Sequence, residues 1–157
     1  MANKEAAPAE KLVCVNRQAR HNYFIDETYE AGMVLVGSEV KSLRDGKANL
    51  SDSYAQIRKG EAFLINFHIS PYPGANQFNH EPTRTRKLLL NAREIDRLTG
   101  KTKERGLTVI ALKVYFKNGR AKVEIGLGRG KKLYDKRDTL KRKNAERDIE
   151  RSLRTRR

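Results

Sequence analysis

The most regular pattern in the chain is an alternation of apolar with polar or small residues on both sides of Asn118-Gly119. The apolar positions of this pattern are Ile110, Leu112, Val114, Phe116, Ala121, Val123, Ile125 and Leu127. A period of two is typical of β-strands, and Asn-Gly is the strongest short signal for a hairpin turn. We therefore predict an antiparallel hairpin with one face in the core and the other in water.

A second hairpin is predicted around Lys59-Gly60, between strands over Ser53–Arg58 and Glu61–Ile69. In the later strand four large apolar residues fall on alternate positions and should share a face: Phe63, Ile65, Phe67 and Ile69. Other strand-like segments are Leu12–Val15, Tyr23–Glu30, Met33–Val36 and Lys87–Leu90. Many strands at hairpin spacing with few helices predict a mainly β protein, a small antiparallel OB-like β-barrel.

Two short helices are predicted from capping signals. Ser38 has the chemistry of an N-cap for a helix over Glu39–Arg44. Asn91 and Glu94 have the spacing of a capping box variant at the start of another helix, which should end at Gly100. These helices would decorate the barrel.

The pattern changes after Gly130, where apolar residues become too sparse for a core. Residues 131–157 contain 12 Lys and Arg against 5 Asp and Glu. Four basic residues step by four, four and three, and would form one stripe on a helix: Lys143, Arg147, Arg151 and Arg154. We predict three regions: a disordered N-terminus over 1–11, the barrel over 12–130, and a basic tail over 131–157, disordered alone and helical on RNA.

Net charge indicates the class of partner. The chain has 34 Lys and Arg against 19 Asp and Glu, a net charge of +15, which favours a polyanion such as nucleic acid. A membrane surface is disfavoured, because no long amphipathic helix with an aromatic face is evident and the chain has no Trp. No apolar stretch approaches the ~18 residues of a membrane span, and the first ten residues do not resemble a signal peptide. We therefore expect a cytoplasmic protein.

Enzymatic and metal chemistry find little support in the sequence. Cys14 is the only cysteine, which excludes an internal disulfide and a C-x-x-C zinc site. The three histidines, His21, His68 and His80, are scattered. The glycine-rich segment 126–132 lacks the Ser or Thr and the spacing of a phosphate loop, and we interpret it as a flexible hinge between barrel and tail. We expect no catalysis, cofactor or metal.

Two series of basic residues are candidates for phosphate contacts. The alternative for each is an ordinary solvated face, but the excess of positive charge favours RNA for at least one series. His21 would contact RNA or pack against the barrel rim. The first series is Arg17, Arg20, Lys41, Arg44 and Lys47, and the second is Arg84, Arg86 and Lys87.

Six collinear segments between Val13 and Arg137 are familiar as motifs. They are 19–25 (ARHNYFI), 29–32 (YEAG), 39–44 (EVKSLR), 46–54 (GKANLSDSY), 82–90 (PTRTRKLLL) and 130–137 (GKKLYDKR). In these segments the chain resembles the SsrA-binding protein family (SmpB), the protein partners of transfer-messenger RNA. Gln18 departs from the family, which often has a basic residue there, and beyond Arg137 the motifs stop.

The resemblance implies an OB-like barrel with about three short helices that binds the tRNA-like domain of transfer-messenger RNA. The complex would enter stalled ribosomes, with the tail in the decoding centre and the empty mRNA channel, and the unfinished peptide would be tagged for destruction. The protein would be monomeric on the RNA and would perform no chemistry. A structural rRNA-binding protein and an RNA-modifying enzyme are the alternatives from composition.

The resemblance also implies roles for single residues. The RNA-binding positions of the family fall on Glu30, Leu89 and Asn91, with basic support from Lys41, Arg44 and Lys47. Glu30 is acidic and would accept hydrogen bonds from base edges or 2′-hydroxyls, or orient a neighbouring arginine. The ribosome-facing motif of the family falls on Tyr134, Asp135, Lys136 and Arg137, directly after Lys131 and Lys132, which would face the ribosome with it. Beyond Arg137, the ribosome-facing role of the basic stripe is expected from charge and spacing alone.

Overall fold

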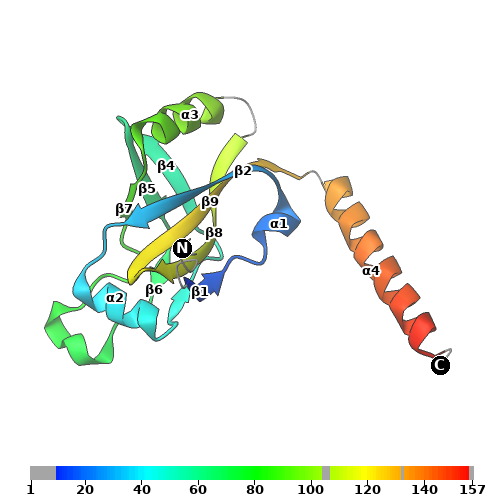
Figure 1. The fold of residues 1–157 in the computed structure, drawn as a ribbon, viewed down its shortest axis with the longest axis horizontal. Helices are drawn as coiled ribbons and strands as arrows, with labels where there is room; N and C mark the ends of the chain where they lie inside the picture. The colour runs from blue at the N-terminus through cyan, green and yellow to red at the C-terminus, as the bar shows by residue number, and fades with distance from the viewer. Residues whose placement is uncertain (1–9, 104–106, 132, 156–157) are drawn as a thin grey trace, which may run out of the picture.

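Seven of the β-strands that the structure describes pair antiparallel in one large sheet (Figure 1). The computed structural model describes residues 10–103, 107–131 and 133–155, and the side chains in these ranges except those of 76–78, 133–139 and 155. In chain order the elements are β1 (Glu10–Val15), α1 (Ala19–Asn22), β2 (Tyr23–Met33), α2 (Gly37–Arg44), β3 (Ala48–Asn49), β4 (Tyr54–Arg58), β5 (Glu61–Ile65), β6 (His68–Ile69), the 3-10 helix η1 (Pro73–Phe78), β7 (Arg86–Leu89), α3 (Ala92–Thr102), β8 (Leu107–Lys117), β9 (Arg120–Gly130) and α4 (Leu133–Thr155). The prediction of a mainly β, antiparallel fold is confirmed.

The strand pairings close into a ring. From β8 they run through β4, β5, β7, β2 and β9 and return to β8. β1 and β4 share one edge of β8: β4 pairs with residues 109–110 and β1 with residues 113–117. A closed ring leaves few unpaired strand edges, which is what a small barrel requires. β1 begins at Glu10, inside the segment predicted to be disordered; the rest of that segment, 1–9, lies outside the described residues.

The described residues contain four α-helices, where the sequence predicts about three short ones and a tail. Figure 1 shows α2 and α3 at opposite ends of the sheet and α4 projecting away from the body. Leu98 of α3 is fully buried against the core. The short helix α1 follows β1 and has no counterpart among the predicted elements.

Both predicted hairpins are confirmed, and the backbone conformation of their turn residues explains why they form. Lys59, Gly60, Asn118 and Gly119 have positive φ values of 49°, 74°, 52° and 75°. Two successive residues with positive φ form the tight turn that matches the twist of paired strands, and Asn and Gly adopt this conformation most readily. The turns connect β4 to β5 and β8 to β9.

The prediction of one wet face along the whole β8–β9 hairpin is wrong. The strand register shifts between Ala111 and Lys113, which changes the face that alternate residues present. Val109 and Ala111 therefore lie in the main core before the shift, and Val114 and Phe116 lie there after it. On the other face, Ile110 and Leu112 pack with Ala19 in a second cluster beneath α1.

The predicted shared face of Phe63, Ile65, Phe67 and Ile69 is also wrong. Asn66 has a positive φ of 61°, which ends β5 and turns the chain before β6. Ala62 and Leu64 are buried in the core instead, while Phe63 and Ile65 are half-buried. A left-handed residue inside an apolar run breaks the period of two, so the alternation cannot continue across it.

The predicted N-cap position of α3, Asn91, is confirmed, whereas the predicted N-cap of α2, Ser38, is wrong. α2 begins at Gly37 with Val36 as N-cap, and Ser38 lies inside the helix, where its hydroxyl contacts Nδ1 of His80 at 2.8 Å. Asn91 is the N-cap of α3, but its side chain makes no capping bond and donates from Nδ2 to Oε1 of Glu94 at 3.0 Å.

The segment predicted to be a flexible hinge is instead part of the sheet. Gly126, Gly128 and Gly130 pair with β2, and the first two also pair with β8. A Cβ on Gly126 would lie 2.9 Å from Cδ1 of Leu112 and 3.0 Å from Cγ2 of Ile25. Glycine is therefore needed here because neighbouring side chains occupy that space, and the tail begins only after β9.

Candidate nucleic-acid interface

A buried ion pair removes one residue from the predicted interface. The Arg86 side chain is fully buried and donates to the Glu39 carboxylate, to the carbonyl oxygen of Phe67 and, at 3.1 Å, to that of Pro82. Arg84 Nη2 lies 2.6 Å from Oε1 of the same glutamate. The prediction that Arg86 contacts phosphate is therefore wrong, because its guanidinium is enclosed and its hydrogen bonds join α2 to β7.

Burial would raise the pKa of the Glu39 carboxyl, but hydrogen bonds from Arg84 and the backbone N–H of Val36, with the charge of Arg86, hold it below its ordinary value. Glu39 is thus an anion inside the body. An ionised pair of this kind is stable only when its remaining hydrogen-bonding atoms are also satisfied.

The other predicted basic residues are at least partly exposed. Arg17 lies just before α1 and Arg20 lies on it. Lys41 and Arg44 lie on α2, and Lys47 follows this helix. Figure 1 shows α1 and α2 in separate parts of the body, so the first series forms two groups rather than one patch. Arg84 and His21 are half-buried, and Lys87 is exposed with Nζ 3.2 Å from Oε1 of Glu61.

Glu30 and Leu89 flank a hollow surface at the end of β2. Gly32 of β2 lies opposite Leu89 of β7 on one side and opposite Lys122 of β9 on the other. A Cβ on Gly32 would lie 3.3 Å from Cβ of Leu89, and this missing side chain leaves a pocket of about 230 Å³ between the two neighbours. Leu89 is 55% exposed, an unusual state for a leucine beside a core.

A second hollow of about 470 Å³ adjoins the first and is lined by Glu30. Arg120 and Lys122 line both hollows, so they connect Glu30 to Leu89. Sequence reasoning missed these two residues, although both follow Asn118-Gly119 on the polar positions of the predicted hairpin. We call the two hollows together the Glu30–Leu89 groove. Asn91 is exposed at the N-terminus of α3, two residues after Leu89.

The carboxylate of Glu30 is held in place by the neighbouring strand. The Tyr115 hydroxyl donates to Oε2, and Nζ of Lys117 lies 3.4 Å from the same oxygen. The hydrogen bond from Tyr115 and the charge of Lys117 lower the pKa of Glu30. Both contacts use Oε2, which leaves Oε1 as an acceptor directed by its neighbours. A fixed, ionised acceptor among basic side chains can bind the amino group of a base or a 2′-hydroxyl beside a phosphate.

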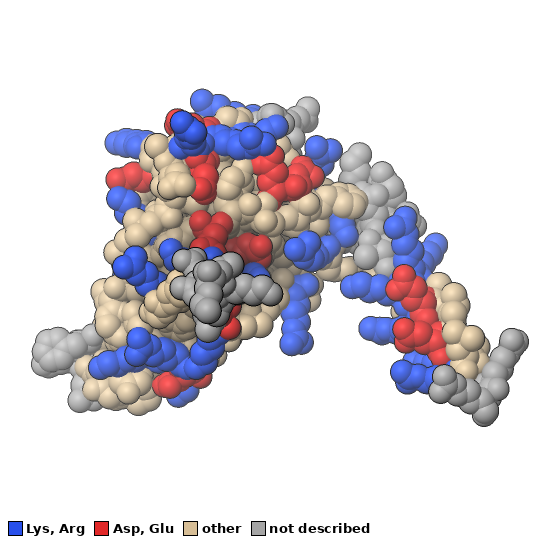
Figure 2. Space-filling view, in the orientation of Figure 1, with Lys and Arg blue, Asp and Glu red and all other residues tan. Residues whose placement is uncertain are grey.

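The predicted basic stripe lies on α4. Lys143, Arg147, Arg151 and Arg154 are all exposed, and their spacing places them on one side of this helix. Figure 2 shows Lys and Arg along one side of α4, with Asp and Glu beside them. The side chains of Lys132, Tyr134, Asp135, Lys136 and Arg137 lie outside the described residues.

Within the described residues, no group of three His, Cys, Asp or Glu side chains is placed to hold a metal ion. Of the described helices, none is both long and apolar enough to cross a membrane. A ring of antiparallel strands with an apolar and basic groove, joined to a long basic helix, defines a small nucleic-acid-binding β protein.

Comparison with known proteins identifies the family. Residues 13–155 match the family described as SmpB protein. The SsrA-binding protein of Desulforudis audaxviator (strain MP104C) is 63% identical over 149 residues, covering 95% of this chain and 97% of that protein. The SsrA-binding protein of Geobacillus thermodenitrificans (strain NG80-2) is 60% identical over 146 residues, covering 93% and 94%. The chain therefore belongs to the SmpB family.

A solved structure supports the same assignment. One of its chains, from work described as "tmRNA-SmpB: a journey to the center of the bacterial ribosome", is 50% identical to this chain. The TM-score is 0.64, and the match covers 82% of this chain and 87% of that one. The fold seen here is thus the fold of that chain.

Proposed function

We propose that this protein is the adaptor that binds the tRNA-like domain of transfer-messenger RNA and delivers it to stalled ribosomes. The observation that carries the proposal is the match to the SmpB family over residues 13–155, together with relatives named for binding SsrA. The geometry supports it, because the positions that the family uses for RNA, Glu30 and Leu89, lie in one groove with three basic residues, Lys117, Arg120 and Lys122.

The body and the tail have separate tasks in this proposal. The Glu30–Leu89 groove and Asn91 hold the RNA, with phosphate contacts from Lys41, Arg44 and Lys47. α4 enters the ribosome, where its basic stripe lies against RNA in the decoding centre and the empty mRNA channel. The protein acts as a monomer on the RNA in the cytoplasm, positions it without catalysing a reaction, and needs no cofactor.

RNA binding by the groove is tested by gel shift with purified transfer-messenger RNA. Glu30→Gln keeps the shape but removes the charge, and Asn91→Ala removes the amide at the start of α3. We expect each to weaken binding by roughly ten-fold, because removing one partner of a charged hydrogen bond costs ~1.5–3 kcal/mol.

Glu61→Gln is the matched control, since Glu61 is also exposed and paired with a lysine but lies outside the groove. Wild-type affinity in both groove variants would contradict the assigned interface. A protein that remained on all ribosomes after a high-salt wash, rather than on stalled ones, would instead be a structural rRNA-binding protein.

A further inference from the structure

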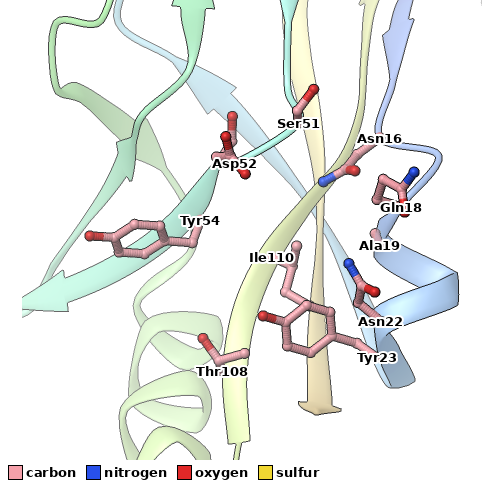
Figure 3. Close-up of a pocket in the computed structure, with 11 residues that line it drawn as sticks. Asn16, Gln18, Ala19, Asn22, Tyr23, Ser51, Asp52, Tyr54, Thr108 and Ile110 are labelled. Carbon is pink, nitrogen blue, oxygen red and sulfur yellow. The ribbon is translucent and has the colours of Figure 1, made fainter. Parts of the chain in front are cut away.

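A polar pocket of about 320 Å³ opens between α1, the segment before β4, and β8 (Figure 3). It shares no lining residue with the Glu30–Leu89 groove. Most of its lining comes from segments 19–25 and 46–54, two of the segments on which the family resemblance rests. Asn16 and Gln18, just before α1, and Thr108 and Ile110 of β8 complete it (Figure 3). Two motifs far apart in the sequence therefore meet at one site that the proposed function leaves unused.

In the described part of the chain, the lining of this pocket is polar but contains no cation. The chain carries a net charge of +15, yet among the described residues no Lys or Arg lines the pocket. Amides, hydroxyls and one carboxylate line it instead, including Gln18, Asn22, Ser51, Asp52 and Tyr54. A phosphate would require cations, whereas the edge of a base presents neutral donors and acceptors. A volume near ~300 Å³ lies at the lower end of small-ligand pockets.

Asn16, which lines the pocket, carries a buried acceptor without a partner among the described residues. Its side chain is 7% exposed, and Nδ2 donates to the carbonyl oxygen of Ala111 at 3.0 Å. Because a carbonyl oxygen accepts only, this bond fixes which end of the amide is nitrogen. Oδ1 is buried and has no hydrogen-bond partner among the described residues, which is rare for a buried amide. With the exposed carboxylate of Asp52, the pocket favours a ligand that donates hydrogen bonds.

Tyr23 supplies an aromatic surface beside these acceptors. Its ring packs against the cluster of Ala19, Ile110 and Leu112, and Figure 3 shows it reaching from the start of β2 toward Ile110 and Thr108 of β8. The faces of aromatic rings stack on unpaired bases with little dependence on sequence.

We propose that this pocket binds an unpaired nucleobase that carries an amino group. Asn22 lines the pocket, and its backbone carbonyl oxygen accepts a hydrogen bond from the backbone N–H of Lys131 at 2.8 Å. The pocket therefore adjoins the start of the tail, and the base belongs to the ribosomal RNA that α4 meets. The source of the base rests on the proposed function, whereas the chemistry of the pocket does not.

The chemistry is tested by NMR titration of the full-length protein with AMP, CMP, GMP and UMP. We expect saturable shifts of the backbone amides of Asn22, Tyr23, Asp52 and Thr108, with UMP at least five-fold weaker because uracil has no amino group. Inorganic phosphate should leave these signals unchanged. Equal shifts with UMP or phosphate, or no shifts with any nucleotide, would overturn the proposal.

The source of the base is tested with Asp52→Asn, with Asp96→Asn on α3 as the matched exposed control. We expect Asp52→Asn to weaken AMP, CMP and GMP at least five-fold, and to weaken binding of the protein–RNA complex to stalled ribosomes similarly. Affinity for transfer-messenger RNA should stay within two-fold. If Asp52→Asn weakened only the affinity for transfer-messenger RNA, the assignment of the base to ribosomal RNA would be overturned. A failure of the proposed function would appear separately, as wild-type protein that does not bind this RNA.

Discussion

The β body and α4 use charged residues in different ways. In the body, Glu39 and Arg86 are buried together, and Glu27 is paired with Arg97 at 2.5 Å. In α4 every side chain that the structure describes is exposed, and basic residues form a stripe along the helix. Charge in the body therefore positions strands and helices, while charge in the tail lies on an exposed surface where another molecule can meet it. The net charge of the chain does not distinguish these two uses.

Removing the tail should distinguish the functions of the body and of α4 most clearly. A protein ending at Lys131 should tag no peptides in a reconstituted translation assay, because nothing would occupy the decoding centre. Its affinity for transfer-messenger RNA should remain within about three-fold, and its free energy of unfolding within ~0.5 kcal/mol, as for surface changes away from the core. A large loss of RNA affinity would show that the tail also holds the RNA.

The shortened protein also tests when α4 forms. Leu133–Thr155 is a helix in this structure, while a helix of this composition without tertiary contacts is marginal in water. We expect the helical signal in circular dichroism to be only slightly larger for the free full-length protein than for the shortened one. This difference should grow when RNA is added. A full helical difference without RNA would contradict folding on binding.

Within the body, the neighbours Arg86 and Lys87 should differ sharply in how much each contributes to the free energy of unfolding. Arg86→Ala removes the fully buried one of the two arginines that pair with the buried Glu39 carboxylate and should cost ~3–5 kcal/mol in urea unfolding. Lys87→Ala removes an exposed pair with Glu61 and should cost less than ~1 kcal/mol. Similar losses for both variants would show that burial does not separate their roles.

Glu30 is the exception in the body, a charge that is fixed yet partly exposed. Tyr115→Phe removes the hydroxyl that donates to Glu30, so the pKa of Glu30 should rise toward its ordinary value. Affinity for the RNA should fall roughly three- to ten-fold, the range of one hydrogen bond. Tyr29→Phe is the control, because Tyr29 donates to Glu27 at 2.5 Å outside the groove. Equal losses would point to a general effect on the sheet.

The smallest effect concerns the surface pair of Glu27 and Arg97. Hydrogen bonds from Arg97 and then from Tyr29 lower the pKa of Glu27 to about 2 from 4.5. A carboxyl whose pKa is depressed in the folded state stabilises the fold above its unfolded pKa, and this contribution is lost as pH falls from about 4.5 toward 2. Urea midpoints at pH 6 and pH 3 should therefore differ less in Glu27→Gln than in wild type.

Local signals predicted much of the fold and part of the interface. The turn residues Asn118 and Gly119 require only their own backbone preferences, so the hairpin could be predicted from the sequence. The groove could not be predicted in the same way, since it depends on the alignment of Leu89, Gly32 and Lys122 across three strands. Only the resemblance to a family pointed to Glu30 and Leu89, and nothing pointed to Tyr115.

The sequence by itself determined the β hairpins, the basic tail and a polyanionic partner, because these follow from neighbouring residues and from summed charge. Tertiary structure decided which charges remain available. Arg86 looks like its neighbours in the sequence, yet the closed sheet buries it against Glu39. It also decided that the glycines around Gly126 belong to a strand, because the lack of a Cβ there serves the packing of Leu112 and Ile25. Long-range contacts set burial, and burial determines whether a charge supports the fold or binds a ligand.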